Sequence, residues 1–415
     1  MVRFLFSVLL AGALLSFAQS PPATDSTTDT RSAGIEAARR AKAASITPQQ
    51  ATRNPFAVME ESLDKGLGVW NGMRAGAHGL SLHLGGLAVG SGLAFGPEYI
   101  YKTGDLYNPD LIWDSYAVAS FQTYYRLQTR LEAPKLLNGH AFGNIEAVRF
   151  DYPRVAYYGP GPDSKKTGRT DFRMQDNYAD FRGGYQVGSR FRIGILGGFQ
   201  NIKIGAGTAD QYASTDATYT EAEAPGLDQK ANFWNGGFFL KFDSRDNPGD
   251  AHSGTFLYSQ FQVVEGSRKR LGAFNQYDFE AQHFFHFWNR RRVIATRFKT
   301  SLTTPRRGTF VPFYLEPRLG GQDDLRGFRP YRFYDQNSVL VQGEYRWTVM
   351  EPLELAIFAD GGKVFHEWQN FSLAGLEADA GIGLRVRRNE FVPLRVDVGF
   401  SREGFQIWLI FYNIF

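Results

Sequence analysis

The chain has 415 residues, of which 36 are Phe, 20 are Tyr, 7 are Trp and 45 are Gly, and it contains no cysteine. The lack of cysteine excludes disulfide bonds, thiolate nucleophiles, zinc–thiolate sites and iron–sulfur clusters. The formal net charge is only +4, and because the basic residues are spread along the chain, the charge pattern argues against a nucleic-acid-binding protein.

The first segment, residues 1–18, has the pattern of a secretory signal peptide. Arg3 gives a positive start, Phe4–Leu15 is mostly apolar, and the small residues Ser16 and Ala18 lie at the expected cleavage positions. We therefore expect the protein to be exported. No later stretch approaches the ~20 apolar residues of a transmembrane helix. The remaining classes are a soluble exported protein and a transmembrane β-barrel.

The next segment, residues 19–66, is rich in Ala, Ser, Thr, Pro and Gln. The sequence allows a short helix over Gly34–Ala44, but no apolar face repeats along the segment. Independent domains rarely have fewer than about 50 residues. We therefore expect a flexible periplasmic tether here rather than a folded periplasmic domain.

From Leu67 onward, turn-forming clusters of Gly, Pro and Asn separate segments of about 9 to 14 residues in which polar and apolar side chains alternate. Over 339–349 the apolar face holds Val339, Val341, Tyr345, Trp347 and Val349, and the polar face holds Gln342, Glu344, Arg346 and Thr348. The strands of a soluble β-sandwich also alternate between polar and apolar side chains, but aromatic residues at strand ends favour a membrane barrel. We predict an all-β fold over residues 67–415, a transmembrane antiparallel β-barrel of about 16 strands.

A polar, glycine-rich segment at Leu319–Phe328 interrupts the alternation and predicts a loop. Glycines near both of its ends allow tight folding, which presents Arg326 at the tip of the loop. Glu344 and Asp360 lie on the polar faces of the two strands that follow. Their carboxylates are therefore suited to accept paired hydrogen bonds from the guanidinium of Arg326. An ordinary surface loop is the alternative interpretation.

These two regions resemble the BamA/TamA outer-membrane assembly superfamily, also called the bacterial surface antigen family. The residues that carry the resemblance are Leu325, Arg326, Gly327 and Phe328 in the loop and Phe358, Asp360 and Gly362 in the strand. The resemblance implies that the loop is inserted into the barrel lumen and that Arg326 pairs with Asp360 on the barrel wall.

Other parts of the sequence are similar to the same family. The residues Asp243, Arg245, Asp246, Asn247 and Gly254 resemble its strand-turn-strand signature. Phe411 and Phe415 resemble its C-terminal barrel-assembly signal, although Asn413 interrupts the apolar series. The tryptophans Trp234, Trp347, Trp368 and Trp408 are expected near the membrane interfaces or packed in the barrel wall.

The resemblance implies a role in outer-membrane biogenesis, as protein insertion or translocation, without catalysis of a covalent reaction. Family members that fold or secrete other proteins carry periplasmic POTRA domains. Because residues 19–66 are too few to hold one, a barrel-only member is expected. The expected partners are outer-membrane lipid and either separate periplasmic proteins or barrel clients, with no nucleic acid and no cofactor.

Two alternative functions stay open at this point. The first is a passive pore or surface antigen that keeps the barrel without assembly activity. The second is an outer-membrane lipid hydrolase, which the sequence supports less, because it has no Gly-x-Ser-x-Gly motif.

Overall fold

The computed structural model of the protein describes residues 79–88, 91–104, 109–227, 230–267, 272–288, 290–350, 352–388 and 391–410. The predicted signal peptide and tether, the first part of the predicted barrel region, and Phe411 and Phe415 lie outside the described residues. All of the described residues belong to one unit, Lys65–Phe415.

Sixteen strands form one sheet in which the strand order follows the chain. They are β1 (Leu80–Gly86), β2 (Leu93–Gly104), β3 (Pro109–Ser120), β4 (Tyr125–Leu136), β5 (Ala141–Tyr157), β6 (Thr170–Val187), β7 (Phe191–Ala206), β8 (Lys230–Asp243), β9 (Gly254–Gly266), β10 (Phe274–Phe287), β11 (Arg292–Pro305), β14 (Asn337–Met350), β15 (Leu353–Phe365), β16 (Glu377–Arg388), β17 (Phe391–Ser401) and β18 (Gly404–Ile410). A separate two-stranded hairpin, β12 (Arg318–Leu319) and β13 (Phe333–Tyr334), lies in the connection between β11 and β14.

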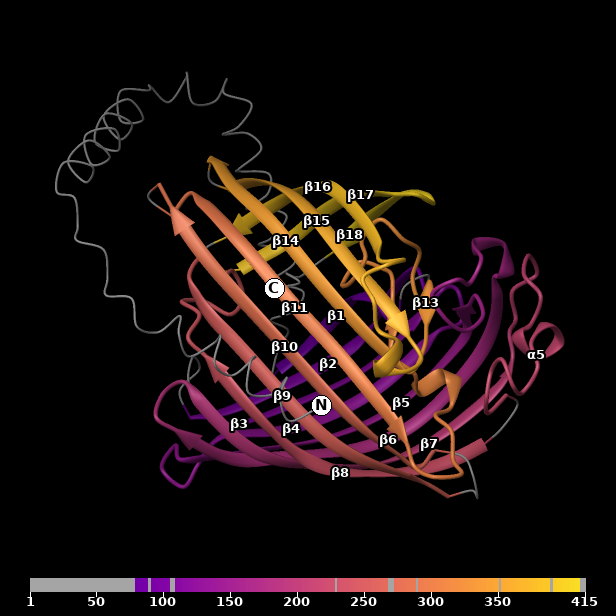
Figure 1. Ribbon diagram of the computed structural model, residues 1–415. Coiled ribbons are helices and arrows are strands. Elements are labelled where there is room, and N and C mark those ends of the chain that lie inside the picture. The colour runs from indigo at the N-terminus through magenta and orange to yellow at the C-terminus, as the bar shows by residue number, and fades with distance from the viewer. Residues whose placement is uncertain are drawn as a thin grey trace, which may run out of the picture. The chain divides into compact units, whose positions relative to one another are not determined.

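Figure 1 shows that the sheet curves round on itself into a barrel. Neighbouring strands are antiparallel throughout the sheet, for example β10 with β11 and β14 with β15. The predicted all-β fold, an antiparallel barrel of about 16 strands, is therefore confirmed. The helical elements of the described part are single turns, η3 (Lys166–Gly168), α5 (Thr215–Thr218), η4 (Phe313–Leu315) and η5 (Trp368–Asn370). A search of the described residues finds no helix with the length and apolar character needed to cross a membrane.

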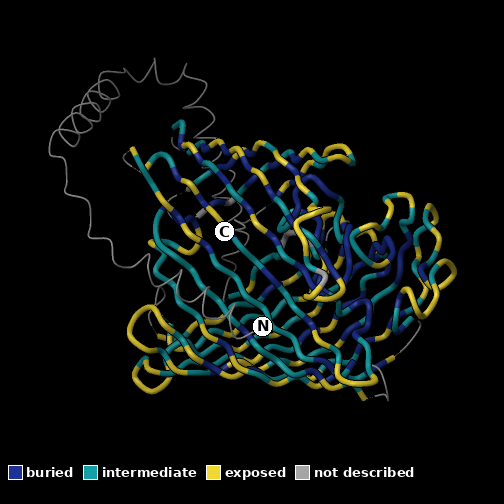
Figure 2. Tube along the Cα trace, viewed as in Figure 1, coloured by how far each residue is buried: buried dark blue, intermediate teal, exposed yellow. Residues whose placement is uncertain are grey.

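Side chains on the strands alternate between the outer wall and the lumen. On β14, Val341 and Trp347 are exposed on the outer wall, whereas Gln342, Glu344 and Arg346 are buried on the inner side. Figure 2 shows buried and more exposed residues alternating in the same way along the strands. The predicted alternation over 339–349 is confirmed. An outer wall of exposed aliphatic and aromatic side chains is the surface that a lipid-facing barrel requires.

The two ends of the barrel differ in the length of their connections. One end, which we call the long-loop end, carries the loops 158–169, 207–229, 306–336 and 366–376. The other, which we call the short-turn end, carries the turns 137–140 and 188–190, and its longest connection is 244–253. The long-loop end lies at the right of Figure 1, around β13 and α5.

Two of the long loops pack into the lumen at the long-loop end. The hydroxyl of Tyr157, at the end of β5, donates to the carbonyl oxygen of Glu223 at 2.6 Å. The ring of Tyr157 also contacts that of Phe313, with 5.0 Å between centroids. These contacts belong to a buried apolar core that includes Val155, Tyr157, Phe172, Ile202, Ile204, Phe233, Val311, Phe313 and Tyr334. The loops therefore fill this end of the lumen with close-packed side chains.

Candidate functional site

The loop 306–336, which joins β11 to β14, folds back into the lumen. Gly320 and Gly321 follow the first strand of its hairpin with φ of +109° and +114°, a region in which other residues are strained. The turn is closed by the N–H of Gly321, which donates to the carbonyl oxygen of Leu325 at 3.2 Å. This backbone path brings the segment 325–328, which we call the loop tip, against the inner wall of the barrel.

The guanidinium of Arg326 lies among three carboxylates and is fully buried. Its Nε and Nη2 donate to the two carboxylate oxygens of Asp360, each at 2.7 Å. Its Nη1 donates to Oε2 of Glu344 at 2.8 Å and to Oδ2 of Asp397 at 3.4 Å. The arrangement is a bidentate arginine–carboxylate pair with two further acceptors, the geometry in which such hydrogen bonds are strongest.

Apolar contacts surround the loop tip. The guanidinium carbon of Arg326 lies 3.5 Å from the ring centroid of Phe358, which is a cation–π contact. A Cβ on Gly362 would lie 3.0 Å from Cδ1 of Leu319, so the glycine leaves room for the loop. The side chains beside the arginine are buried in one cluster, which consists of Leu319, Leu325, Phe328, Phe333, Leu340 and Val364. The structure thus brings the predicted loop residues against the predicted strand residues.

The last two strands of the sheet, β17 and β18, contact the loop tip from the other side. Nε1 of Trp408 donates to the carbonyl oxygen of Arg326 at 2.7 Å. The hydroxyl of Ser401 donates to the carbonyl oxygen of Gly327 at 2.8 Å. A Cβ on Gly399 would lie only 2.6 Å from the carbonyl oxygen of Arg326. The two backbones therefore approach to a distance that only glycine allows. Sequence reasoning did not identify Gly399 or Ser401, and it expected Trp408 near a membrane interface or in the barrel wall without predicting its contact with the loop tip.

A wider charge network surrounds the loop tip. Arg385 and Arg395 are directly opposite each other on β16 and β17, and both are fully buried. Like charges in this position repel each other. Nη2 of Arg385 lies 2.6 Å from Oε1 of Glu344, and Nε of Arg395 donates to Oδ2 of Asp397 at 2.8 Å. Glu344 and Asp397 therefore each neutralise an arginine of the wall as well as Arg326.

The base of the loop is tied to other parts of the long-loop end. Nε of Arg332 donates to the carboxylate of Glu403, in the turn between β17 and β18, at 2.9 and 3.0 Å. Its Nη1 donates to the hydroxyl of Ser164 at 2.9 Å. The hydroxyl of Tyr334 donates to the carbonyl oxygen of Ala156 at 3.1 Å. The loop therefore bridges β5, the β5–β6 connection and the end of the sheet.

The predicted strand-turn-strand residues lie at the short-turn end and are not part of this site. In the connection between β8 and β9, Arg245 donates two hydrogen bonds of 2.9 Å to the carboxylate of Asp243. Oδ1 of Asp246 accepts the backbone N–H of Asn247 at 3.0 Å. Gly254 has a φ of +104°. These residues build a turn that joins two strands.

An antiparallel barrel with an apolar outer wall and a buried arginine loop in its lumen defines a class of integral membrane barrel protein. Residues 120–406 match the Omp85 superfamily domain, and the chain therefore belongs to the Omp85 superfamily. It is an integral outer-membrane protein with a general role in protein insertion or translocation, and it is not an enzyme.

Solved structures share the fold at low sequence identity. BamA from Haemophilus ducreyi lacking POTRA domains 1–3 gives a TM-score of 0.59 and 13% identity, covering 80% of this chain and 70% of that chain. CdiB from Escherichia coli gives a TM-score of 0.53 and 12% identity, covering 80% of this chain and 62% of that chain. A comparison with curated proteins finds no match.

Proposed function

We propose that this protein inserts β-barrel clients into the outer membrane by pairing a client strand with the edge of its own sheet, and that the Arg326 loop supports that edge from within. The observation that carries the proposal is the attachment of the loop tip to β17 and β18, through Ser401 and Trp408. The general role of the superfamily supports it.

The edges of the sheet are β1 and β18. Within the described residues, no ladder joins these two strands. An edge strand in a bilayer leaves N–H and C=O groups without partners, at a cost of several kcal/mol for each group. A strand from another chain supplies the missing partners. An unfolded barrel protein therefore gains the most hydrogen bonds by pairing one of its strands with an edge strand of this sheet.

The loop connects the edge to the body of the barrel. The side chain of Arg326 is bonded to Asp360 on β15 and Glu344 on β14. Its carbonyl oxygen is bonded to Trp408 on β18. One residue thus fixes the last strand relative to strands that are three and four ladders away. We infer that this attachment keeps β18 extended and in register while its free side is available to a client.

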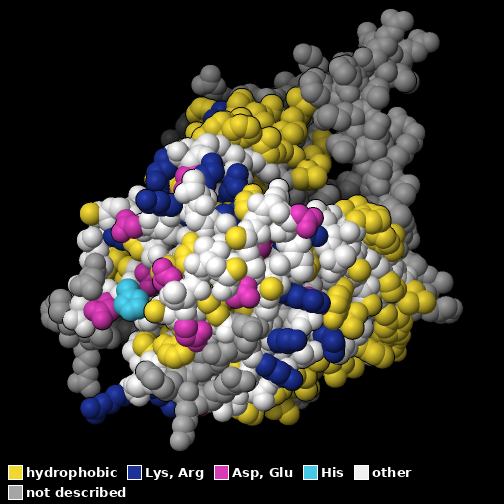
Figure 3. All heavy atoms as spheres, turned by 90° about the vertical axis from the view of Figure 1, so that its right-hand side faces the viewer, with side chains coloured by type: hydrophobic (Ala, Val, Ile, Leu, Met, Phe, Trp, Pro, Cys, Tyr) yellow, Lys and Arg dark blue, Asp and Glu magenta, His cyan; other side chains and the backbone are white. Residues whose placement is uncertain are grey.

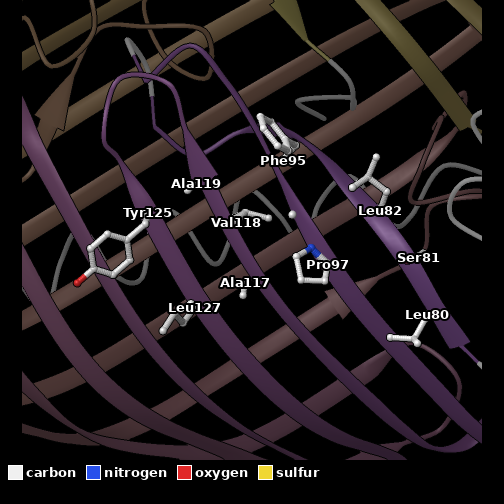
Figure 4. Close-up of a pocket in the computed structure, with 11 residues that line it drawn as sticks. Leu80, Ser81, Leu82, Phe95, Pro97, Ala117, Val118, Ala119, Tyr125 and Leu127 are labelled. Carbon is white, nitrogen blue, oxygen red and sulfur yellow. The ribbon is translucent and has the colours of Figure 1, made fainter.

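The outer wall beside the other edge is hollowed and apolar. A groove of about 910 Å³ crosses β1 to β4 and is lined by Leu80, Leu82, Phe95, Pro97, Ala117, Ala119 and Leu127, among others. Figure 4 shows these residues on neighbouring strands. The small side chains of Ala117 and Ala119, on β3, leave space in this groove. An incoming strand can place its lipid-facing side chains over such a surface.

The packing of the lumen argues against a passive pore. The loops 207–229 and 306–336 fill the long-loop end, where Phe313 and Tyr334 are completely buried. An open channel requires a hydrated path between the two ends of the barrel, and these buried side chains occupy space at one end of that path.

The experiment that tests the proposal uses the purified chain in liposomes. A urea-unfolded barrel protein is diluted into the liposomes, and its folding is followed by its shift in mobility on an unheated gel. We expect the chain to speed folding relative to empty liposomes. Steady ion conductance without faster client folding would show a passive pore and would contradict the proposal.

A further inference from the structure

The outer wall carries a polar pocket that the proposed function does not use. It has a volume of about 150 Å³ and lies across β4 to β8. Apart from Phe150, its lining residues bear basic, amide or phenolic groups, and they are Tyr125, Arg149, Gln175, Asn177, Asn201, Lys203 and Lys230.

The basic side chains of this pocket point away from the lumen. Ile202 and Ile204, on both sides of Lys203 in β7, are buried in the core inside the barrel, so Lys203 between them faces outward. Arg149 is paired in register with Leu127, which is exposed on the outer wall. Lys230 is paired with Lys203. The three cations therefore share the face that contacts the membrane.

The pocket lies at the border of the membrane. On the same face, Phe199 and Trp234 are paired in register four residues away from Lys203 and Lys230, and their ring centroids are 5.4 Å apart. Aromatic residues of this kind mark the membrane–water interface. In outer-membrane barrels the longer loops are extracellular. The pocket therefore lies at the depth of the headgroups of the outer leaflet.

The cations of the pocket outnumber the carboxylates near them within the described residues. Lys203 and Lys230 face each other directly, which is unfavourable for like charges. Neither they nor Arg149 forms an ion pair within the part of the chain that the structure describes. Among the described residues, the carboxylate near the pocket on this face is that of Asp151, which is buried and accepts hydrogen bonds from Arg173 at 2.9 and 2.5 Å and from Gln175 at 2.7 Å.

We propose that this pocket binds the phosphate group of a lipid headgroup in the outer leaflet. Lysine and arginine are the usual donors to phosphate, and basic clusters at a bilayer surface attract anionic lipids. A phosphate between Lys203 and Lys230 removes their mutual repulsion. The hydroxyl of Tyr125 and the amide of Asn177 suit the hydroxyl groups of a sugar or glycerol. Figure 3, which faces the long-loop end, shows Lys and Arg side chains gathered at the border of the hydrophobic outer wall.

A lipid is the occupant that the position selects. The pocket opens sideways on a wall whose neighbouring exposed residues, such as Ile195 and Phe199, face the membrane. A soluble partner cannot reach this wall without displacing the headgroups that already surround it. The site is also distant in sequence from the loop tip, and it does not depend on the insertion activity proposed above.

Native mass spectrometry of the detergent-solubilised full chain tests the proposal. The probes are a bisphosphorylated glucosamine-disaccharide lipid, the same lipid without its phosphates, and inorganic phosphate. We expect one phosphorylated lipid to stay bound to each chain and the dephosphorylated lipid to dissociate. In the double variant Lys203→Gln and Lys230→Gln, binding should weaken about thirtyfold, or about fivefold for each lysine.

The matched control removes the same charge elsewhere at the long-loop end. Lys165→Gln with Arg307→Gln changes two exposed loop residues, and this variant should bind like the original chain. Arg149→Gln is a second variant of the pocket, to be used if the double lysine variant does not fold. Equal binding by pocket and control variants, or retention of the dephosphorylated lipid, would overturn the proposal. Retention of inorganic phosphate without the lipid would overturn the lipid assignment.

Discussion

The indole N–H of Trp408, on the last strand of the barrel, donates a 2.7 Å hydrogen bond to the carbonyl oxygen of Arg326 at the tip of the lumen loop. The two residues are 82 positions apart in the chain. Through its side chain the same arginine is bonded to Asp360 on β15. A single loop residue therefore links the edge strand β18 to β15, three strands further into the sheet.

Arg326→Ala should lower the stability of the barrel. It leaves buried carboxylates on Asp360 and Glu344 without their shared cation, a change that costs about 3–5 kcal/mol at buried ion pairs. The measurement is the temperature at which the folded band disappears on an unheated gel. Arg307→Ala, an exposed position of the same loop, is the control. An unchanged transition in the Arg326 variant would contradict the structural role.

Trp408→Phe should loosen β18 while it keeps an aromatic ring in place. The carbonyl oxygen of Arg326 loses its donor in a buried site, at a cost of about 1–3 kcal/mol. Hydrogen exchange of the β18 amides should become faster. Trp234→Phe changes a tryptophan that is 49% exposed on the outer wall and should leave β18 unaffected. Equal exchange in the two variants would show that the indole bond does not hold the edge.

Gly399→Ala should displace the loop tip, because the added Cβ would lie 2.6 Å from the backbone carbonyl of Arg326. Overpacking of this kind costs about 1–3 kcal/mol. Limited trypsin digestion should cut the loop faster after Arg326 or Arg329. The control, Gly343→Ala on β14, adds a Cβ with no atom within 4 Å. If both variants resist digestion to the same extent, the close approach at Gly399 is not needed to seat the loop.

Glu316, at the base of the lumen loop, should make the free energy of unfolding depend on pH. Burial, together with the neighbouring carboxylate of Asp335, raises the pKa of Glu316 from 4.5 to about 8. Because its pKa is higher in the folded than in the unfolded protein, the contribution of Glu316 to stability is present in full below about pH 4.5 and is lost as the pH rises to about 8. Glu316→Gln is uncharged at every pH and should remove this loss.

The measurement compares the thermal transition of the original chain with that of Glu316→Gln at about pH 5 and about pH 9, which lie on either side of the titration of Glu316. The original chain should lose more stability than Glu316→Gln over this interval. Parallel losses in the two proteins would show that Glu316 does not titrate in this range.

The alternation of side chains was enough to predict which face of a strand is buried. It placed Glu344 and Asp360 on the polar faces of consecutive strands, and the structure brings both carboxylates to Arg326. This succeeds because β14 and β15 are adjacent in sequence and in the sheet. The alternation of side chains and the pairing of consecutive strands can both be read from a short stretch of sequence.

The contacts with Asp397 and Trp408 could not be predicted in the same way. Alternation shows that Asp397 faces inward, but the distance between a loop and a strand that lies 71 residues further on depends on the curvature of the whole barrel. The opposition of Lys203 and Lys230 depends on strand register across the 207–229 loop, which sequence period does not fix. Contacts that depend on the curvature of the barrel or on the register of its strands are therefore known only from the structure.

Site-specific crosslinking shows whether a client strand pairs with the edge of the sheet. The chain has no cysteine, so a single one can be placed at Ile407 on β18 or, as the control, at Ile195 on β7. Both side chains are on the outer wall, 63% and 60% exposed. A barrel client that carries one cysteine in its terminal strand is then captured during insertion with a short thiol crosslinker. We expect crosslinks at position 407 and none at position 195, and equal crosslinking at both positions would contradict client pairing at the β18 edge.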